Sequence, residues 1–179
     1  MASDLNWRRL KFWRRLLGQA LDPNTEPGAL ESISEIQVDH GPHAVVQAWE
    51  LVSFLAYRLG WTVKAGRVQP GVEIAWQATA PHGLLRVRIR RLADGPSEIR
   101  RVRIACALDG KPSALVFAAE DTGRLSVTRE GSDTEPRTVA VPPQPLAGLV
   151  GRQLADREQD PIFRESMAVA QVMAQSVLG

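Results

Sequence analysis

The chain has 179 residues, an apolar fraction of 44% and five tryptophans, which exclude a mainly disordered protein and suit one folded domain with a substantial core. No apolar run is long enough to span a membrane, and arginines interrupt the N-terminal stretch where a secretion signal needs an apolar run, so we expect a cytoplasmic protein. The net charge is only +2, and the single cysteine, Cys106, excludes a disulfide within the chain and a multi-cysteine metal site.

Residues 4–21 predict an amphipathic N-terminal helix, with Asp4 as its N-cap. Its apolar side chains fall on one broad arc, formed by Leu5, Leu10, Phe12, Trp13, Leu16, Leu17, Ala20 and Leu21. Arg9 projects into the middle of this arc, where an unpaired buried charge would be too costly. We therefore expect Arg9 to form a structural ion pair, and its partner to be one of the carboxylates of the acidic stretch 22–50.

Two shorter elements are expected before the main sheet. A short strand is expected from Leu30 or Ile33 to Val38, and Gly41-Pro42 opens a second helix over residues 43–59. This helix is apolar nearly all round, which is typical of a helix buried on most sides.

From Val72 the apolar period changes from 3.6 to 2, which predicts β-strands. Tight turns separate successive strands as far as residue 141, and a proline-rich connector then leads to C-terminal helices over residues 146–178. We therefore expect a single α+β domain over residues 1–179. Its sheet, over residues 72–141, would be an antiparallel meander of about five or six strands with helices packed on one face.

The sequence offers no constellation that requires catalysis. Gly-Pro separates His40 from His43, and His82 lies in a different turn, so solvated loop histidines are favoured over a metal site. Cys106 falls on the apolar side of its expected strand and is interpreted as a core residue. No nucleophile elbow, P-loop or dinucleotide-binding glycine pattern occurs. We predict neither a catalytic residue, nor a metal, nor a cofactor.

Residues 86–103 contain seven arginines, and two interpretations remain open for them. If their two strands pair, the arginines crowd together, which is unfavourable unless acids intervene. In the first interpretation acidic side chains interleave with them on a solvated face; the candidates are Glu73, Glu98, Glu120 and Glu130. In the second, the arginines form a docking surface for an acidic partner or a phosphate.

The first helix offers a second candidate surface, because its apolar arc is wider than one core contact requires. Trp13 is interpreted as core, whereas Trp7, beside Arg14 at the edge of the arc, is the better interface candidate. The predicted partner-binding residues of both surfaces are Trp7, Arg8, Arg14, Arg86, Arg88, Arg101 and Arg103.

Three motifs carry a resemblance to a known family. The pattern Asp4-Leu5-x-Trp7-x-Arg9-Leu10-x-x-Trp13-Arg14 resembles the opening of the C-terminal module of the glucose-6-phosphate dehydrogenase assembly proteins, the OpcA family of cyanobacteria and actinobacteria. The second helix closes in Ala56-Tyr57-Arg58-Leu59-Gly60-Trp61, similar to the family's second motif, and residues 157–166 resemble its closing segment. The motifs occur in the family's order and span nearly the whole chain.

The resemblance implies a bacterial, non-catalytic accessory protein of the oxidative pentose phosphate pathway. Such a protein binds glucose-6-phosphate dehydrogenase, promotes its active oligomer and raises its activity as an allosteric activator. The alternative from the residues alone is a basic binding module for nucleic acid or another anionic partner. Basic and acidic blocks alternate along the chain and can neutralise one another, which disfavours nucleic acid as the partner.

Overall fold

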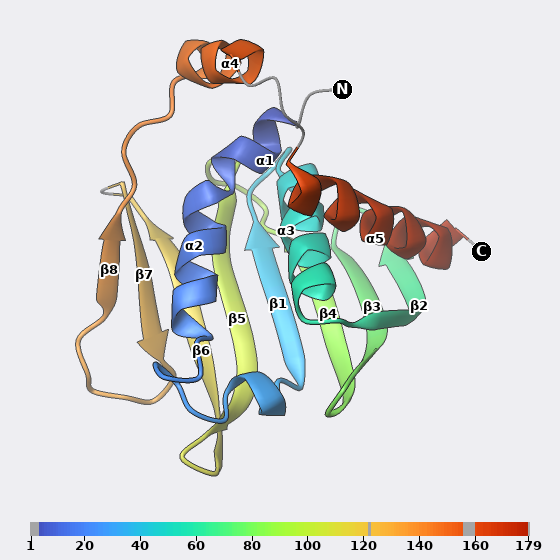
Figure 1. Ribbon diagram of the computed structural model, residues 1–179, viewed down its shortest axis with the longest axis vertical. Helices are drawn as coiled ribbons and strands as arrows, with labels where there is room; N and C mark the ends of the chain where they lie inside the picture. Colours follow the sequence, from blue (N-terminus) through green and yellow to red (C-terminus); the bar gives the residue numbers. More distant parts are fainter. Residues whose placement is uncertain (1–3, 122, 156–159, 179) are drawn as a thin grey trace.

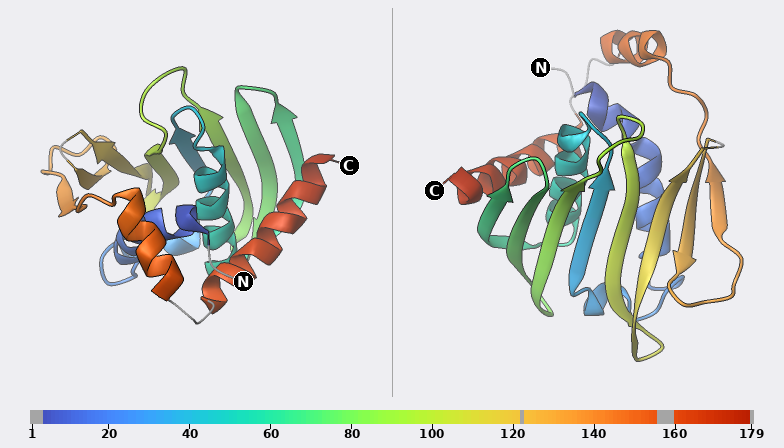
Figure 2. Two further views of the ribbon diagram at one scale, coloured as in Figure 1. Left: turned by 90° about the horizontal axis from the view of Figure 1, so that it is seen from above. Right: turned by 180° about the vertical axis from the view of Figure 1, so that it is seen from behind.

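The computed structural model describes residues 4–121, 123–155 and 160–178. An eight-stranded mixed sheet lies at its centre, with the strand order β2-β3-β4-β1-β5-β6-β7-β8 (Figure 1). Seen from behind, the sheet has no described helix over its second face, which we call the open face (Figure 2). The strands are β1 (Glu35–His40), β2 (Thr62–Gln69), β3 (Glu73–Ala80), β4 (Gly83–Arg91), β5 (Ile99–Leu108), β6 (Lys111–Glu120), β7 (Arg124–Arg129) and β8 (Arg137–Ala140).

Helices cover the other face of the sheet. They are α1 (Leu5–Arg9), α2 (Lys11–Ala20), α3 (Val45–Arg58), α4 (Leu146–Ala155) and α5 (Pro161–Leu178), with a short 3₁₀ turn, η1 (Leu30–Ser32). The central helix α3 packs on β1 and β4, α2 packs on β7, and α5 packs on α3 and the edge strand β2. In contrast, α4 stands beyond the ends of the strands and contacts α1.

The predicted antiparallel meander of five or six strands is wrong, because the sheet has eight strands and includes one parallel pair. Two strands come from outside the expected range of residues 72–141: β1 and β2. The segment 62–69 forms an exposed edge strand, so it lacks the apolar alternation that marks a strand with a buried face. The third family motif begins at residues 157–159, which lie outside the described residues.

β1 occupies the middle of the sheet, between two strands that are consecutive in the chain. It pairs in parallel with β4 and antiparallel with β5. Gln37 lies between Arg88 of β4 and Arg103 of β5, and Glu35 is the register partner of Arg86. The two arginine-rich strands therefore never pair with each other, because a strand carrying Glu35 and Asp39 separates them.

The core beneath α3 and α5 is organised around a tryptophan. Trp76 of β3 is 2% exposed, and its indole meets Trp49 of α3 edge to face with 4.9 Å between ring centres. Its Nε1 donates a hydrogen bond to the carbonyl of Met173 on α5, at 3.1 Å. Gly66 on β2 faces the same helix, and a Cβ there would lie 2.3 Å from a methyl group of Val177. The missing side chain lets α5 pack closely on the edge strand.

The expected N-terminal helix over residues 4–21 is divided into two at Leu10. Asp4 caps α1 as predicted, its carboxylate accepting the amide proton of Asn6 at 2.8 Å. Leu10 has ψ near zero, and its amide points to the carbonyls of Arg8 and Asn6. This tightened turn changes the direction of the chain, so residues before and after Leu10 do not continue one apolar arc.

Two loops meet at Gly41, at the end of β1. The Gly41 amide donates a hydrogen bond to the Glu98 carbonyl at 2.9 Å, and a Cβ on Gly41 would lie 1.8 Å from the carbonyl oxygen of Pro96. Gly41→Ala should therefore force the backbones apart and lower the free energy of unfolding by about 1–3 kcal/mol in urea denaturation.

The matched control for this substitution is Gly18→Ala in α2, where a Cβ meets no atom within 4 Å. An exposed helical glycine loses more conformational entropy on folding than alanine, so this variant should gain about 0.5–1 kcal/mol. An unchanged urea midpoint for Gly41→Ala would contradict the close approach of the two loops.

Candidate functional site

Trp7 lies in the interior and not at an interface, which corrects the expectation that it faces a partner. It is 2% exposed, and its ring packs against Phe54 of α3 and Phe163 of α5, with ring centres 5.9 Å and 5.2 Å away. The physical reason is the break at Leu10, which directs α1 toward α3 and α5. Trp7 therefore joins three helices within the chain.

Asp160 fixes the position of this tryptophan. Its Oδ2 accepts a hydrogen bond from Trp7 Nε1 at 2.8 Å, while Oδ1 accepts the amide protons of Ile162 at 2.9 Å and Phe163 at 3.3 Å. The residue thus caps α5, which begins at Pro161, and also ties the start of α5 to α1. No local sequence pattern predicts the hydrogen bond between Trp7 and Asp160, because the two residues are 153 positions apart.

Two ionisable side chains, the half-buried Arg14 and the buried Glu50, lie near Trp7 in the helical layer. The Arg14 guanidinium stacks on the indole, 3.7 Å from its centre, and lies 3.8 Å from Asp160 Oδ2. Burial lowers the pKa of Arg14, opposed by the charges of Asp160 and Glu50. Glu50 on α3 is 4% exposed; burial and the nearby negative charge of Asp4 raise its pKa to about 8, and Arg14 offsets only part of this rise. Arg14 therefore helps hold the helices together.

The predicted structural ion pair of Arg9 is wrong. Arg9 is exposed, and it makes no ion pair or side-chain hydrogen bond with another described residue. The break at Leu10 removes it from the apolar arc on which the prediction rested. Its neighbour Arg8 is half-buried, and Arg8 Nε donates a hydrogen bond to Gln153 of α4.

Acidic side chains interleave with most arginines of the open face. Arg88 lies 2.7 Å from Glu35 and 3.5 Å from Glu73, and Arg103 binds Glu130 through two hydrogen bonds, at 2.6 Å and 3.1 Å. These bonds raise the pKa of Arg103 and lower that of Glu130. Sequence reasoning named Glu73 and Glu130 but missed Glu35, because the position of β1 in the sheet has no local signal.

Two arginines of the open face, Arg86 and Arg101, are more exposed and less tightly paired than the others. Arg86 lies 3.8 Å from Glu35 while 63% of its side chain is exposed. Arg101 is exposed and makes no ion pair or side-chain hydrogen bond with another described residue. Of the predicted set, the structure thus brings Arg86, Arg88, Arg101 and Arg103 together on the open face, and Trp7 with Arg14 inside the helical layer.

His40 is a buried residue of β1 and not the solvated loop histidine that was expected, whereas His82 is exposed and Cys106 lies in the core as expected. His40 is buried, with Nδ1 2.7 Å from the carbonyl oxygen of Gly41, and His82 Nε2 lies 2.8 Å from that of Ile33. Cys106 is 4% exposed, and burial raises the pKa of its thiol. Among the residues that the structure describes, no three potential metal-ligating side chains gather, and no helix is both long and apolar enough to cross a membrane.

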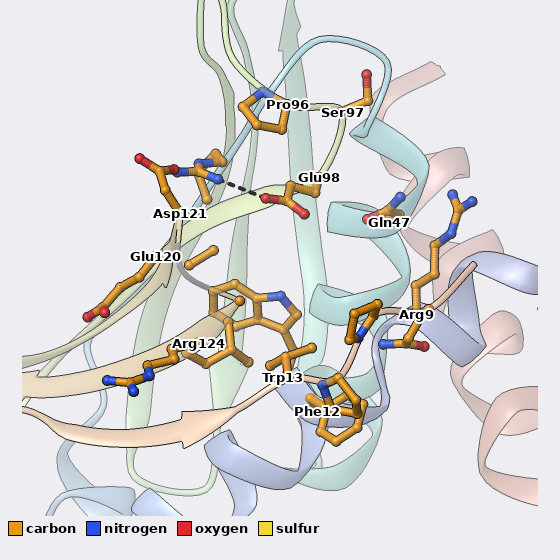
Figure 3. Close-up of a pocket in the computed structure, with 18 residues that line it drawn as sticks. Arg9, Phe12, Trp13, Gln47, Pro96, Ser97, Glu98, Glu120, Asp121 and Arg124 are labelled. Carbon is orange, nitrogen blue, oxygen red and sulfur yellow. Dashed lines mark hydrogen bonds and ion pairs between the residues drawn. The ribbon is translucent and has the colours of Figure 1, made fainter. Parts of the chain in front are cut away.

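A cleft of about 660 Å³ lies between the helical layer and the ends of β5, β6 and β7. In the view of Figure 3, Glu98 and Gln47 lie above Trp13 and Phe12. Its lining residues are Arg9, Phe12, Trp13, Gln47, Pro96, Ser97, Glu98, Arg100, Ala119, Glu120, Asp121, Gly123, Arg124, Leu125, Val141, Pro142, Pro143 and Gln144. Sequence reasoning placed none of these residues in a shared site, since they come from segments that lie far apart in the chain.

Residues 1–167 match the family described as the C-terminal domain of the glucose-6-phosphate dehydrogenase subunit. The chain belongs to this family. The resemblance inferred from three motifs is thus confirmed, and the family description links these residues to a subunit of glucose-6-phosphate dehydrogenase.

Two relatives carry the name OxPP cycle protein OpcA. The one from Synechococcus elongatus is 26% identical over 181 residues, covering 95% of this chain and 41% of the relative. The one from Synechocystis sp. is 28% identical over 186 residues, covering 97% of this chain and 39% of the relative. This member of the family therefore spans about two fifths of the length of these relatives.

Among solved structures, the fold is similar to that of the dehydrogenase MviM from Clostridium difficile. The TM-score is 0.52 at 9% sequence identity, covering 97% of this chain and 60% of that one. At this identity the likeness shows a shared fold for the family member and carries nothing about activity.

Proposed function

We propose that this chain is a non-catalytic accessory module that binds glucose-6-phosphate dehydrogenase and promotes its assembly or activation. The observation that carries the proposal is the family match over residues 1–167, together with relatives named for the OxPP cycle. The proposal includes the absence of turnover by the chain alone, which is measured directly in its test.

The open face of the sheet supports the proposal as a docking surface. It is broad and uncovered by described helices, and its arginines outnumber its carboxylates (Figure 2). The arginines are Arg67, Arg86, Arg88, Arg90, Arg101 and Arg103, and the carboxylates are Glu35, Asp39, Glu73 and Glu130. Paired charges hold most of these side chains in place, while Arg86 and Arg101 retain exposed guanidinium groups for an acidic surface of the dehydrogenase.

The test mixes the chain with its cognate dehydrogenase and measures activity at low glucose 6-phosphate and the mass of the complex by light scattering. Wild type should raise activity or shift the mass, and the chain alone should show no turnover. The double variant Arg86→Glu/Arg101→Glu should weaken binding by at least about tenfold, because it places like charges against the acidic partner.

A matched double variant, Arg15→Glu/Arg152→Glu, reverses two exposed arginines on the helical side and should bind like wild type. Unchanged kinetics and unchanged mass across a wide range of mixing ratios would contradict the proposed function. If both double variants weaken binding equally, the chain still binds the dehydrogenase, but the open face is rejected as the binding surface.

A further inference from the structure

Two largely buried side chains of the cleft keep polar atoms that bond to no other described residue and remain open to solvent in the cleft. Trp13 and Gln47 are each 7% exposed and line the cleft. Neither the indole N–H of Trp13 nor the side-chain amide of Gln47 makes a hydrogen bond to another residue in the described part of the chain. The indole N–H of Trp13 and the amide of Gln47 can therefore form hydrogen bonds with a ligand in the cleft.

The charges around the cleft cancel. Three arginines and three carboxylates line it: Arg9, Arg100, Arg124, Glu98, Glu120 and Asp121. Arg100 pairs with Glu98 at 2.7 Å and with Asp121 at 3.1 Å, which holds the Glu98 carboxylate in place on the wall. A balanced lining does not concentrate either anions or cations, so charge attraction is not the main means of recognition here.

Apolar side chains and prolines make up much of the remaining lining. Phe12, Leu125 and Val141 contribute carbon surface, and three prolines, Pro96, Pro142 and Pro143, form parts of the walls. The cleft thus combines apolar walls with a donor at Trp13, a donor and acceptor at Gln47 and an acceptor at Glu98. Its volume of about 660 Å³ lies within the usual range for small-molecule sites.

We infer that this cleft binds a hexose ring, supplied by a free sugar or by a sugar phosphate. Each hydroxyl of a sugar can both donate to Glu98 or Gln47 and accept from Trp13 or Gln47, which suits the alternating polar groups of the walls. The C–H faces of the ring suit the proline and aliphatic surfaces. This binding activity is independent of the proposed accessory function.

The test titrates the chain alone with glucose, glucose 6-phosphate and inorganic phosphate by isothermal calorimetry, with thermal melting as a second readout. Glucose and glucose 6-phosphate should both bind, with dissociation constants within about tenfold of each other, since a neutral lining gains little from the phosphate. Inorganic phosphate at the same concentrations should neither bind nor compete.

Variants locate the binding within the cleft. Gln47→Leu should weaken the binding of both sugars by at least about tenfold, because the apolar side chain cannot replace two hydrogen bonds. Gln19→Leu, on an exposed position of α2, is the matched control and should bind like wild type. Glu98→Gln, in an exposed loop, tests a second polar group of the cleft without altering the core and should also weaken the binding of both sugars.

Three outcomes would overturn the inference: no binding of either sugar, full competition by inorganic phosphate, or equal affinities for Gln47→Leu and Gln19→Leu. The dehydrogenase takes no part in these titrations, so their failure is distinguishable from a failure of the accessory function.

Discussion

Replacing Trp7 by alanine is expected to lower the free energy of unfolding by about 3–5 kcal/mol, the usual cost of deleting a large buried aromatic side chain. The indole fills the space between α1, α3 and α5, and truncation also leaves the guanidinium of Arg14 without its stacking partner. Urea denaturation followed by circular dichroism measures the change.

Two further variants separate packing from hydrogen bonding at this position. Trp7→Phe keeps an aromatic ring but removes the donor to Asp160, and should cost less than the alanine variant. Tyr57→Ala, which truncates an aromatic ring that is 38% exposed, should cost under about 1 kcal/mol. If Trp7→Ala unfolds at the same urea concentration as Tyr57→Ala, the central role of Trp7 is rejected.

Glu50→Gln is expected to stabilise the protein in alkaline solution by on the order of 2 kcal/mol. The folded-state pKa of Glu50 is raised to about 8 from a model-peptide value of 4.5. Between these two pH values the folded chain therefore holds a proton that the unfolded chain releases, and wild-type stability falls as pH rises through this window. Glutamine cannot ionise, so the variant should lack this loss. The measurement is the melting temperature of both proteins from pH 5 to pH 9.

The matched control is Glu130→Gln, because the pKa of Glu130 is lowered in the folded protein whereas that of Glu50 is raised. Its hydrogen bond with Arg103 lowers the pKa of Glu130, so any contribution of this carboxylate is lost only as pH falls below the usual range of a glutamate. From pH 5 to pH 9 its melting curve should run parallel to that of wild type. If the melting temperature of Glu50→Gln also runs parallel to that of wild type, ionisation of Glu50 is not the cause of the loss of stability at alkaline pH.

Local patterns predicted much of the helical layer and of the strands that bury one face. The apolar helix expected over residues 43–59 corresponds to α3, and the alternation in residues 72–127 corresponds to β3 to β7. The order of strands in the sheet was wrong, because pairing of β1 with β4 depends on residues about fifty positions apart. The helix break at Leu10 likewise could not be predicted, because no proline or glycine marks it. As a result Trp7, expected at an interface, is buried, and Arg9, expected to be buried, is exposed.

The cleft could not be predicted from the sequence for a related reason. Gln47 was visible only as a polar interruption of an apolar helix, and Glu98 only as one acid among the arginines. What makes them a candidate site is the close approach at Gly41, which brings the loop of residues 96–98 over the start of α3. Neither a motif nor a spacing rule reports such a meeting of distant loops.

The central position of β1 also orders the events of folding. β4 and β5 follow each other in the chain but cannot close as a hairpin, since β1 must lie between them. The middle of the sheet can therefore assemble only by long-range closure onto an N-terminal segment, a slower step than the zipping of a hairpin. On the ribosome this segment emerges first, so the strand that separates the two arginine-rich strands is already present when they are synthesised.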